Sequence, residues 1–349
     1  MNITNLFDFS NKLLKCDNTI IYISEHAFYI SILSINENSG RYNYYADEWL
    51  YLINYNYPNG GYYNFFVSNY NNIMRSLRGR ANNLVTAGTD INNDDIIYYN
   101  KNVISLMTTF CKGSVHGYSG FWYTFITYLN NIEKYNELDI IMYNECDSGI
   151  LSIINYFCSI GIIKNEIIFL DKNIRYKFDS VTYIENEHHV FNGRLENMVT
   201  ECIEKYSIIN NSLYNIENNI CIIKSNTSNT NISNNGIFDN KIVDEFCNKY
   251  NIYRVFPKNE IQLINLIYNC KILILNYGST FFKNYVYVSE KCEKIIVIVN
   301  GDGYINDYNY LNSITSNKYQ GIIYKKYKNA EIKYVIVNNN GLNFDPYII

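Results

Sequence analysis

The stretch LILNYGSTFFKN at residues 273–284 decides the fold class of this chain. It begins as an apolar run typical of a buried strand, turns at Tyr277 and Gly278, and continues as a segment that can form a helix. A buried strand followed directly by a helix is the unit from which parallel sheets are built. The turn is either an ordinary turn, with Ser279 or Thr280 as the helix cap, or a cradle in which helix N–H groups hold a phosphate.

The same alternation of short apolar strands and helices extends over two series of segments. The second series has expected strands at 219–225, 252–257, 271–276 and 293–300, and expected helices at 240–251, 260–270 and 280–292. The first series has expected strands at 102–110, 138–144, 165–171 and 179–185, and expected helices at 120–135, 149–161 and 195–209. Gly161 is expected to end the helix at 149–161 as a C′ residue. This alternation implies crossover connections and parallel sheets.

We therefore predict an α/β protein with two Rossmann-like, doubly wound domains. The predicted N-terminal domain spans residues 1–205, and its residues 1–110 form an additional region that is irregular and strand-rich. Residues 19–35 are strand-like and fit a hairpin, whereas residues 71–85 have the pattern of a helix. The predicted C-terminal domain spans residues 206–349. In sheets of this kind, ligands bind at the carboxyl ends of the strands.

The composition limits the classes of function. The chain has 349 residues, of which 48% are apolar, and a formal net charge of −4 without a basic block, so a nucleic-acid partner is not expected. The nine cysteines form no C-x-x-C pair, which favours reduced thiols in a cytosolic compartment. A signal-peptide pattern and an apolar run of membrane-spanning length are both absent from the sequence, so we expect a cytoplasmic protein without a transmembrane segment.

Known glycine motifs do not accompany the turn at Gly278. The sequence has no G-x-x-x-x-G-K-[ST], which disfavours a nucleotide-hydrolysing P-loop, and no G-x-G-x-x-G, which disfavours a dinucleotide oxidoreductase. It also has no G-x-S-x-G elbow, so a serine hydrolase of that type is not expected.

Segments 221–226 and 253–288 resemble the nucleotide-binding half of the DUF563 glycosyltransferases (glycosyltransferase family 61). In that family a strand ends in an Arg, a later strand ends near a Pro, a helix carries a Gln, and the next strand runs into a Gly-His-Gly-(Ala/Ser) loop followed by an Asn. Lys224 stands at the place of the Arg, and Asn276 and Tyr277 replace the first Gly and the His. The positions that match the family are Pro257, Gln262, Gly278, Ser279 and Asn284.

The first half of the chain resembles the same family over residues 119–162. Family members carry a Gly-His-(Phe/Trp) element that opens a helix, followed by a strand and a helix ending in a Gly. Gly120 and Trp122 match this element, but Phe121 takes the place of the histidine. His116 lies just upstream and substitutes for it only if the chain there is a loop that bends back.

The resemblance implies an inverting, metal-independent glycosyltransferase of the GT-B architecture, which needs no cofactor. It implies a nucleotide-sugar donor, of the UDP type, held mainly by the C-terminal domain, and a glycan, protein or polysaccharide acceptor on the N-terminal side. A helix N-terminus and the cationic Lys224 would neutralise the charge that grows on the leaving diphosphate. The residues that this reading assigns to the donor are Lys224, Ser225, Asn226, Pro257, Gln262, Tyr277, Gly278, Ser279, Thr280 and Asn284.

An inverting transferase also needs a base for the acceptor hydroxyl. His116 is the first choice, because the ordinary pKa of histidine suits this role. Asp147 and Glu145 are the second choice, since both follow the expected strand at 138–144. An acidic pair at this place is also typical of metal-dependent transferases that hold Mn²⁺ or Mg²⁺, which leaves a metal-dependent enzyme as an alternative.

Other readings stay open. Phe121 for His, Lys224 for Arg and the altered loop at 276–279 together also fit a non-catalytic relative that keeps the fold for binding or assembly. A polysaccharide pyruvyl transferase would use a similar architecture. His188 and His189, with Glu185 and Glu187, form either a metal cluster or a solvated hinge, and Asp302 lies in an expected turn.

Overall fold

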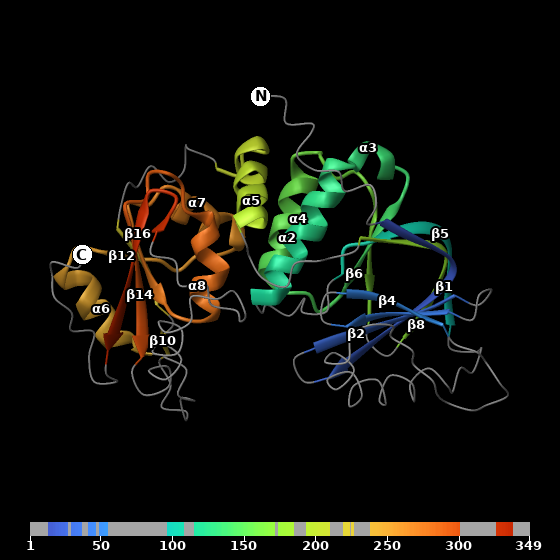
Figure 1. Ribbon diagram of the computed structural model, residues 1–349, viewed down its shortest axis with the longest axis horizontal. Helices are drawn as coiled ribbons and strands as arrows, with labels where there is room; N and C mark the ends of the chain where they lie inside the picture. Colours follow the sequence, from blue (N-terminus) through green and yellow to red (C-terminus); the bar gives the residue numbers. More distant parts are fainter. Residues whose placement is uncertain are drawn as a thin grey trace. The chain divides into compact units, whose positions relative to one another are not determined.

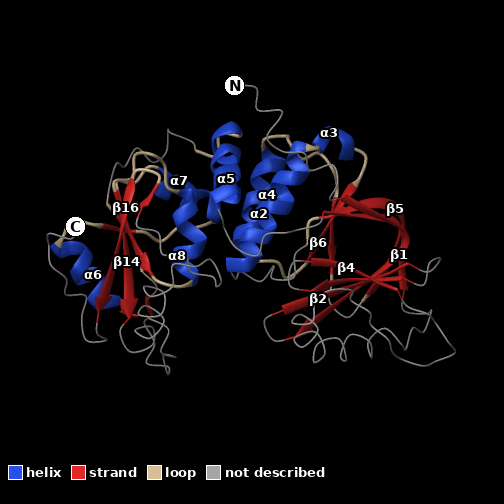
Figure 2. Ribbon diagram, viewed as in Figure 1, coloured by secondary structure: helices blue, strands red, loops and turns tan. Residues whose placement is uncertain are grey.

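The computed structural model describes residues 13–26, 29–36, 41–46, 49–54, 96–107, 115–171, 174–184, 193–209, 219–223, 225–226, 238–300 and 326–337. The chain forms two compact units, Met1–Leu195 and Glu196–Ile349. Each unit contains a sheet with parallel strands and helices, so the predicted α/β class is confirmed (Figures 1 and 2). The helix expected at residues 71–85 lies outside the described residues.

The first unit is built on a mixed eight-stranded sheet, with the spatial order β4-β3-β2-β1-β8-β5-β6-β7. Its antiparallel part comprises β1 (Leu13–His26), β2 (Tyr29–Asn36), β3 (Arg41–Ala46) and β4 (Trp49–Asn54). Its parallel part comprises β5 (Ile96–Ser105), β6 (Asp139–Tyr143), β7 (Ile167–Leu170) and β8 (Arg175–Ile184). The strands β1 and β2 form the hairpin expected in residues 19–35, whereas the extension of one sheet by four antiparallel strands was not predicted.

The described part of the first unit contains the helices α2 (Val115–Asn130), α3 (Ile132–Tyr135) and α4 (Ser148–Ser159). The helix α2 contacts α4 through an aromatic cluster in which Phe125 and Phe157 meet edge to face, with ring centroids 4.9 Å apart. Trp122 and Phe121 join this cluster and are buried. Gly161 follows α4 with a φ of 72°, so the predicted C′ glycine is confirmed.

The second unit is built on a six-stranded sheet with the order β12-β9-β13-β14-β16-β15. Its strands are β9 (Ile220–Ile222), β12 (Tyr253–Arg254), β13 (Ile272–Asn276), β14 (Lys294–Asn300), β15 (Lys326–Tyr327) and β16 (Ala330–Val337). All neighbours pair in parallel except β15 with β16. Counted along the chain, the five parallel strands therefore lie in the order second, first, third, fourth, fifth. The strand β16 was missed by the sequence analysis.

Helices cover both faces of this sheet (Figure 1). They are α5 (Gly193–Lys205), α6 (Asn240–Lys249), α7 (Glu260–Tyr268) and α8 (Ser279–Asn284), which continues into the 3-10 turn η3 (Tyr285–Tyr287). The apolar side of α6 packs on one face, where Phe246 lies in a buried cluster with Ile274 and Ile296. The helices α7 and α8 cover the other face.

The helix expected at 280–292 is shorter than predicted. The helix α8 ends at Asn284, and after η3 the chain becomes extended at Val288, with φ −66° and ψ 145°. The sequence Tyr-Val-Tyr-Val at 285–288 explains the early end, because β-branched and aromatic side chains lose rotamer freedom in a helix.

The helix α5 belongs by its described contacts to the second unit, although the sequence analysis grouped the segment 195–209 with the first series. Polar side chains on three successive turns of α5 form hydrogen bonds with this unit. The three contacts are Glu196 with the Tyr285 hydroxyl, Thr200 with Lys328 Nζ at 3.0 Å and Glu204 with the Tyr268 hydroxyl at 2.8 Å. Hydrogen bonds of this kind to a buried carboxylate such as Glu196 fix the helix in one register.

The buried thiol of Cys202 on α5 is expected to make the second unit less stable at alkaline pH. Burial raises the pKa of Cys202 from 9.0 to about 12, because the thiolate would lose its hydration. The contribution of the buried thiol to the free energy of unfolding is complete below pH 9. It falls by roughly 1.4 kcal/mol per pH unit as the pH rises from 9 towards 12. We expect urea unfolding at pH 8 and pH 10.5 to show this loss, and Cys202→Ala to flatten it. An unchanged pH slope in Cys202→Ala would contradict the assignment.

Candidate functional site

The carboxyl ends of β9 and β13 mark the most distinctive edge of the second unit. The two strands are parallel neighbours, with Ile222 opposite Leu275. The chain leaves β9 towards α6 and leaves β13 towards α8, and these helices lie on opposite faces of the sheet (Figure 1). The strand order reverses at this point, and in open parallel sheets ligands bind where such a reversal opens a crevice outside the strand ends. Both turns chosen from the sequence lie here.

The turn after β13 depends on a glycine. Gly278 has φ 92° and ψ −146°, a backbone conformation that only glycine adopts without strain. A Cβ at this position would meet no atom within 4 Å, so the backbone conformation, and not crowding, requires the glycine. The Tyr277 N–H still donates to the Ile298 carbonyl at 2.8 Å, and its ring meets Phe282 edge to face. The sheet therefore holds this turn on its β14 side.

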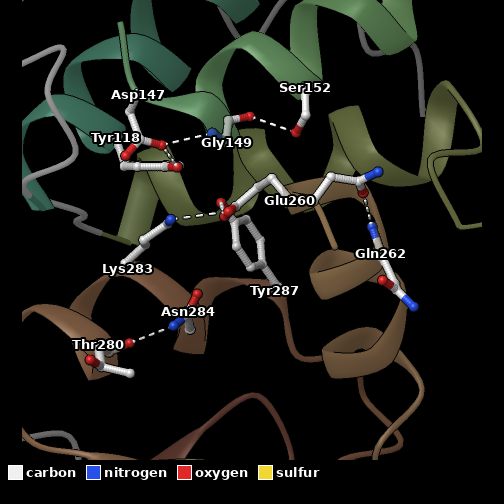
Figure 3. Close-up of polar contacts among 11 residues, drawn as sticks. Tyr118, Asp147, Gly149, Ser152, Glu260, Gln262, Thr280, Lys283, Asn284 and Tyr287 are labelled. Carbon is white, nitrogen blue, oxygen red and sulfur yellow. Dashed lines mark hydrogen bonds and ion pairs between the residues drawn. The ribbon is translucent and has the colours of Figure 1, made fainter. Parts of the chain in front are cut away.

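The helix α8 begins differently from the expectation. Gly278 occupies the N-cap position and makes no side-chain cap, so Ser279 and Thr280 are the first helical residues and not the cap. Thr280 is buried, and its carbonyl accepts a hydrogen bond from Asn284 Nδ2 at 2.8 Å. Asn284 Oδ1 is buried and has no hydrogen-bond partner in the described part of the chain (Figure 3). Asn284 therefore combines a structural bond with an unused acceptor.

The turn between β12 and α7 holds the next two predicted residues. Pro257 is half-buried in this turn. Asn259 is the N-cap of α7, and its Oδ1 accepts from the Gln262 N–H at 2.9 Å. Gln262 Oε1 in return accepts from the Lys258 N–H at 2.7 Å. This reciprocal arrangement is a helix-capping device, so the carbonyl oxygen of Gln262 has a structural role.

A buried ion pair joins α7 to α8, and the sequence analysis missed it. Lys283 Nζ lies 3.0 Å from Glu260 Oε2, and the Tyr287 hydroxyl donates to Glu260 Oε1 at 3.2 Å (Figure 3). Glu260 is 4% exposed and the side chain of Lys283 is 21% exposed. The acidic residue in the first turn of α7 was the only sequence signal, and it does not name the partner. The pair holds the two helices that follow β12 and β13.

The turn after β9 is only partly described. Ser225 and Asn226 form the two-residue strand β10 (Ser225–Asn226), which pairs in parallel with β11 (Phe238–Asp239), so the base of the Asn-rich loop is closed next to α6. Lys224 lies outside the described residues.

Arg254 is a buried cation next to the start of α6, and no motif pointed to it. Its guanidinium donates to the Asn240 carbonyl at 3.1 Å and to Asn240 Oδ1 at 2.6 Å, and it forms an ion pair with Asp244. The side chain is 8% exposed. Arg254 therefore anchors the first turn of α6 to the end of β12.

In the first unit, Asp147 caps a helix. It follows β6 and is the N-cap of α4, where its Oδ1 accepts from the Gly149 N–H at 2.8 Å. The buried Tyr118 hydroxyl, from α2, donates to the same oxygen (Figure 3). Glu145 lies in the same turn and is exposed. The structure thus distinguishes two acidic residues that the sequence could not rank.

The histidine expectation is corrected in part. His116 is the second residue of α2 and not part of a loop, and the position of its side chain lies outside the described part. His116 lies five residues before Phe121 in α2. Phe121 is 1% exposed and stacks on Phe125 with ring centroids 5.1 Å apart. Phe121, which stands where the sequence resemblance would place a histidine, therefore lies in a hydrophobic core.

The remaining metal candidates lie outside the described residues, namely Glu185, Glu187, His188 and His189, and so does Asp302. Within the described ranges, no group of three or more His, Cys, Asp or Glu side chains could hold a metal ion. No helix in the part of the chain that the structure describes has both the length and the apolarity to cross a membrane.

Comparison with protein-family models gives no match for this chain. Comparison with curated protein sequences gives no match either.

Proposed function

We propose that this chain is a glycosyltransferase whose second, Rossmann-like unit binds a nucleotide-sugar donor. The observation that carries the proposal is the position of the turns after β9 and β13. They flank the reversal of strand order in a parallel sheet, and one of them contains a glycine in a conformation open to glycine alone. Such an edge is where nucleotides bind in related architectures. The transfer of a sugar rests on the resemblance of residues 221–226 and 253–288 to glycosyltransferase family 61.

The Gly278 turn supports binding of the donor phosphates in this proposal. A backbone without a Cβ lets a phosphate oxygen approach the N–H groups that follow it. The helix α8 has only six residues, so its dipole is small and a cationic side chain has to supply most of the charge. Lys224, which comes two residues after the end of β9, is the cation that we assign to the leaving diphosphate. The donor is of the UDP type, and no metal or cofactor takes part.

Asp147 is the base that we assign to the acceptor hydroxyl. Its Oδ1 accepts hydrogen bonds from Tyr118 and from the Gly149 N–H, which holds the carboxylate in one orientation. A base that a third group orients is the arrangement that proton transfer requires. His116 stays the alternative base. The acceptor is a glycan, a protein or a polysaccharide.

A thermal-shift screen tests the donor site. The purified chain is heated with UDP, GDP, CMP and their common sugar conjugates, with Mn²⁺ or with EDTA. We expect a shift with one uridine nucleotide that does not need metal, since a ligand at 100 times its Kd stabilises by about 2.7 kcal/mol. A shift only with Mn²⁺ would replace the proposal by a metal-dependent transferase.

Gly278→Ala is expected to abolish this nucleotide shift. An alanine cannot adopt φ 92° and ψ −146° without strain, which costs about 1–3 kcal/mol, so the turn changes its path. The matched control is Gly161→Ala, a second glycine with positive φ and open space around its Cα, which lies at the end of α4. Gly161→Ala should destabilise by about 1–2 kcal/mol and keep the shift. A Gly278→Ala chain that binds as well as the original would remove the turn from the site.

One observation favours a second candidate function, a non-catalytic binding protein with the same fold. Phe121 fills a hydrophobic core at the place where the family carries a histidine. A chain that binds a nucleotide sugar but transfers and hydrolyses nothing, with Asp147→Asn unchanged in every assay, would establish this alternative.

A further inference from the structure

Two cysteines of the second unit lie next to each other, just before the amino ends of two adjacent strands. Cys270 precedes β13 by two residues, and Cys292 precedes β14 by two residues. The register of these parallel strands pairs Ile272 with Lys294. The Glu293 N–H donates to the Lys271 carbonyl at 2.8 Å, so the pairing continues beyond the strands. One step further back along both chains, Cys270 and Cys292 are direct neighbours.

This position meets the geometric requirement of a disulfide. Paired strands lie about 4.8 Å apart, and bridged cysteines have Cα atoms roughly 4.4–6.8 Å apart. Both side chains are fully buried, and the Cys270 thiol makes a hydrogen bond to the Cys292 sulfur. Both cysteines are reduced in this structure. The register thus places the two cysteines opposite each other, at a strand separation within the range of bridged cysteines.

We propose that Cys270 and Cys292 form a reversible disulfide when a hydroperoxide oxidises the protein. The Cys292 sulfur attacks one peroxide oxygen, the O–O bond breaks, and the leaving hydroxide takes the thiol proton to become water. The Cys270 sulfur then attacks the resulting sulfenic sulfur, the S–O bond breaks, and a second water leaves with the Cys270 proton. Two thiols and one hydrogen peroxide give one disulfide and two waters.

The roles of the two thiols follow from their surroundings. The hydrogen bond from Cys270 stabilises the thiolate of Cys292 and lowers the pKa of Cys292. Burial raises the pKa of Cys270, which remains the proton donor. Cys292 is therefore the thiol that reacts first, and Cys270 resolves the sulfenic acid. Because both are buried, the peroxide reaches them through local opening at the amino ends of β13 and β14.

The disulfide would close a loop that contains the Gly278 turn. Residues 271–291 include β13, the Gly278 turn, α8 and η3. The bond therefore ties together both ends of the segment that carries this turn, and it restricts the opening of that segment. This inference does not depend on the proposed function, because it concerns only the thiols and the sheet register.

A second pair of thiols provides the comparison. Cys221 on β9 and Cys247 on α6 are also buried and also share a hydrogen bond. They belong to different layers, a strand and a helix, and no strand register brings their Cα atoms together. We expect no disulfide between them. Cys158 on α4 is half-buried and reports whether the oxidant reacts with the protein at all.

The test treats the full chain with hydrogen peroxide, blocks the remaining thiols and maps the peptides by mass spectrometry without reduction. The expected product is a linked pair of peptides containing Cys270 and Cys292, with a loss of about 2 Da for the two hydrogens. Dithiothreitol should restore the original mass. Cys292→Ser should abolish the linked pair, and Cys221→Ser should leave it unchanged.

Two outcomes would overturn the proposal. One is a map in which Cys158 is oxidised while Cys270 and Cys292 stay reduced. The other is a bond between Cys221 and Cys247 in place of the expected one. Mapping the original chain decides between these outcomes even if Cys292→Ser fails to fold.

Discussion

Lys283→Met is expected to lower the free energy of unfolding by about 3 kcal/mol, because it leaves Glu260 buried without its ammonium partner. Breaking a buried pair costs more than the pair contributes, since the remaining carboxylate has lost its hydration. Lys283 keeps 21% of its side chain exposed, so we place the effect at the lower end of the known range. Tyr287 still donates to the carboxylate, but a neutral donor does not balance the charge.

A double-mutant cycle measures this prediction in urea unfolding. Glu260→Gln combined with Lys283→Met removes both charges and keeps the shape of the side chains. We expect the double variant to be more stable than Lys283→Met alone, because no unpaired charge remains. If Lys283→Met unfolds at the same urea concentration as the original chain, the ion pair does not stabilise the protein. Its geometry would then need another explanation.

Trp122→Ala is expected to destabilise the first unit by about 3–5 kcal/mol, the usual cost of removing a fully buried large aromatic side chain. Trp122 is 0% exposed and lies edge to face with Phe125, with ring centroids 6.4 Å apart. Its loss removes apolar contacts and leaves a cavity between α2 and its neighbours, which rigid elements on both sides cannot close.

The control for this prediction is an aromatic residue on the surface of the same unit. Phe169 on β7 is 43% exposed, and Phe169→Ala should cost about 1 kcal/mol or less. Both variants are compared by the loss of near-ultraviolet signal in urea. Equal midpoints for the two variants would show that the aromatic cluster around α2 is not the core of the unit.

The caps reveal how structural and functional roles overlap in this chain. Asp147 and Gln262 were both chosen from the sequence for chemistry, and both occupy the first turn of a helix at the end of a parallel strand. Polar side chains are frequent at this edge because helix N-termini need acceptors. Ligands bind at the same edge. A sequence signal at such a position therefore supports both roles until the hydrogen bonds are known.

The expected strands agree best with the observed ones where a short apolar run is buried in a parallel sheet. The strands at 138–144, 165–171, 271–276 and 293–300 each match an observed strand, β6, β7, β13 and β14, because short apolar runs in parallel sheets are buried on both faces. The helix expected at 280–292 was too long, because its β-branched and aromatic residues form the 3-10 turn η3 and then an extended residue, Val288. The strand β16 was missed because polar and apolar residues alternate only weakly along it.

The sequence by itself determined the α/β class, the alternation of strands and helices, the Gly161 helix end and the position of the Gly278 turn. All of these depend on neighbours in the chain, since burial period and glycine conformation are local properties. Only the tertiary structure decided the strand order around β9 and β13, the partners of Glu260 and Arg254, the burial of Phe121 and the meeting of Cys270 with Cys292. These depend on which segments distant in sequence pack together, and that choice is made by the burial of many side chains at once.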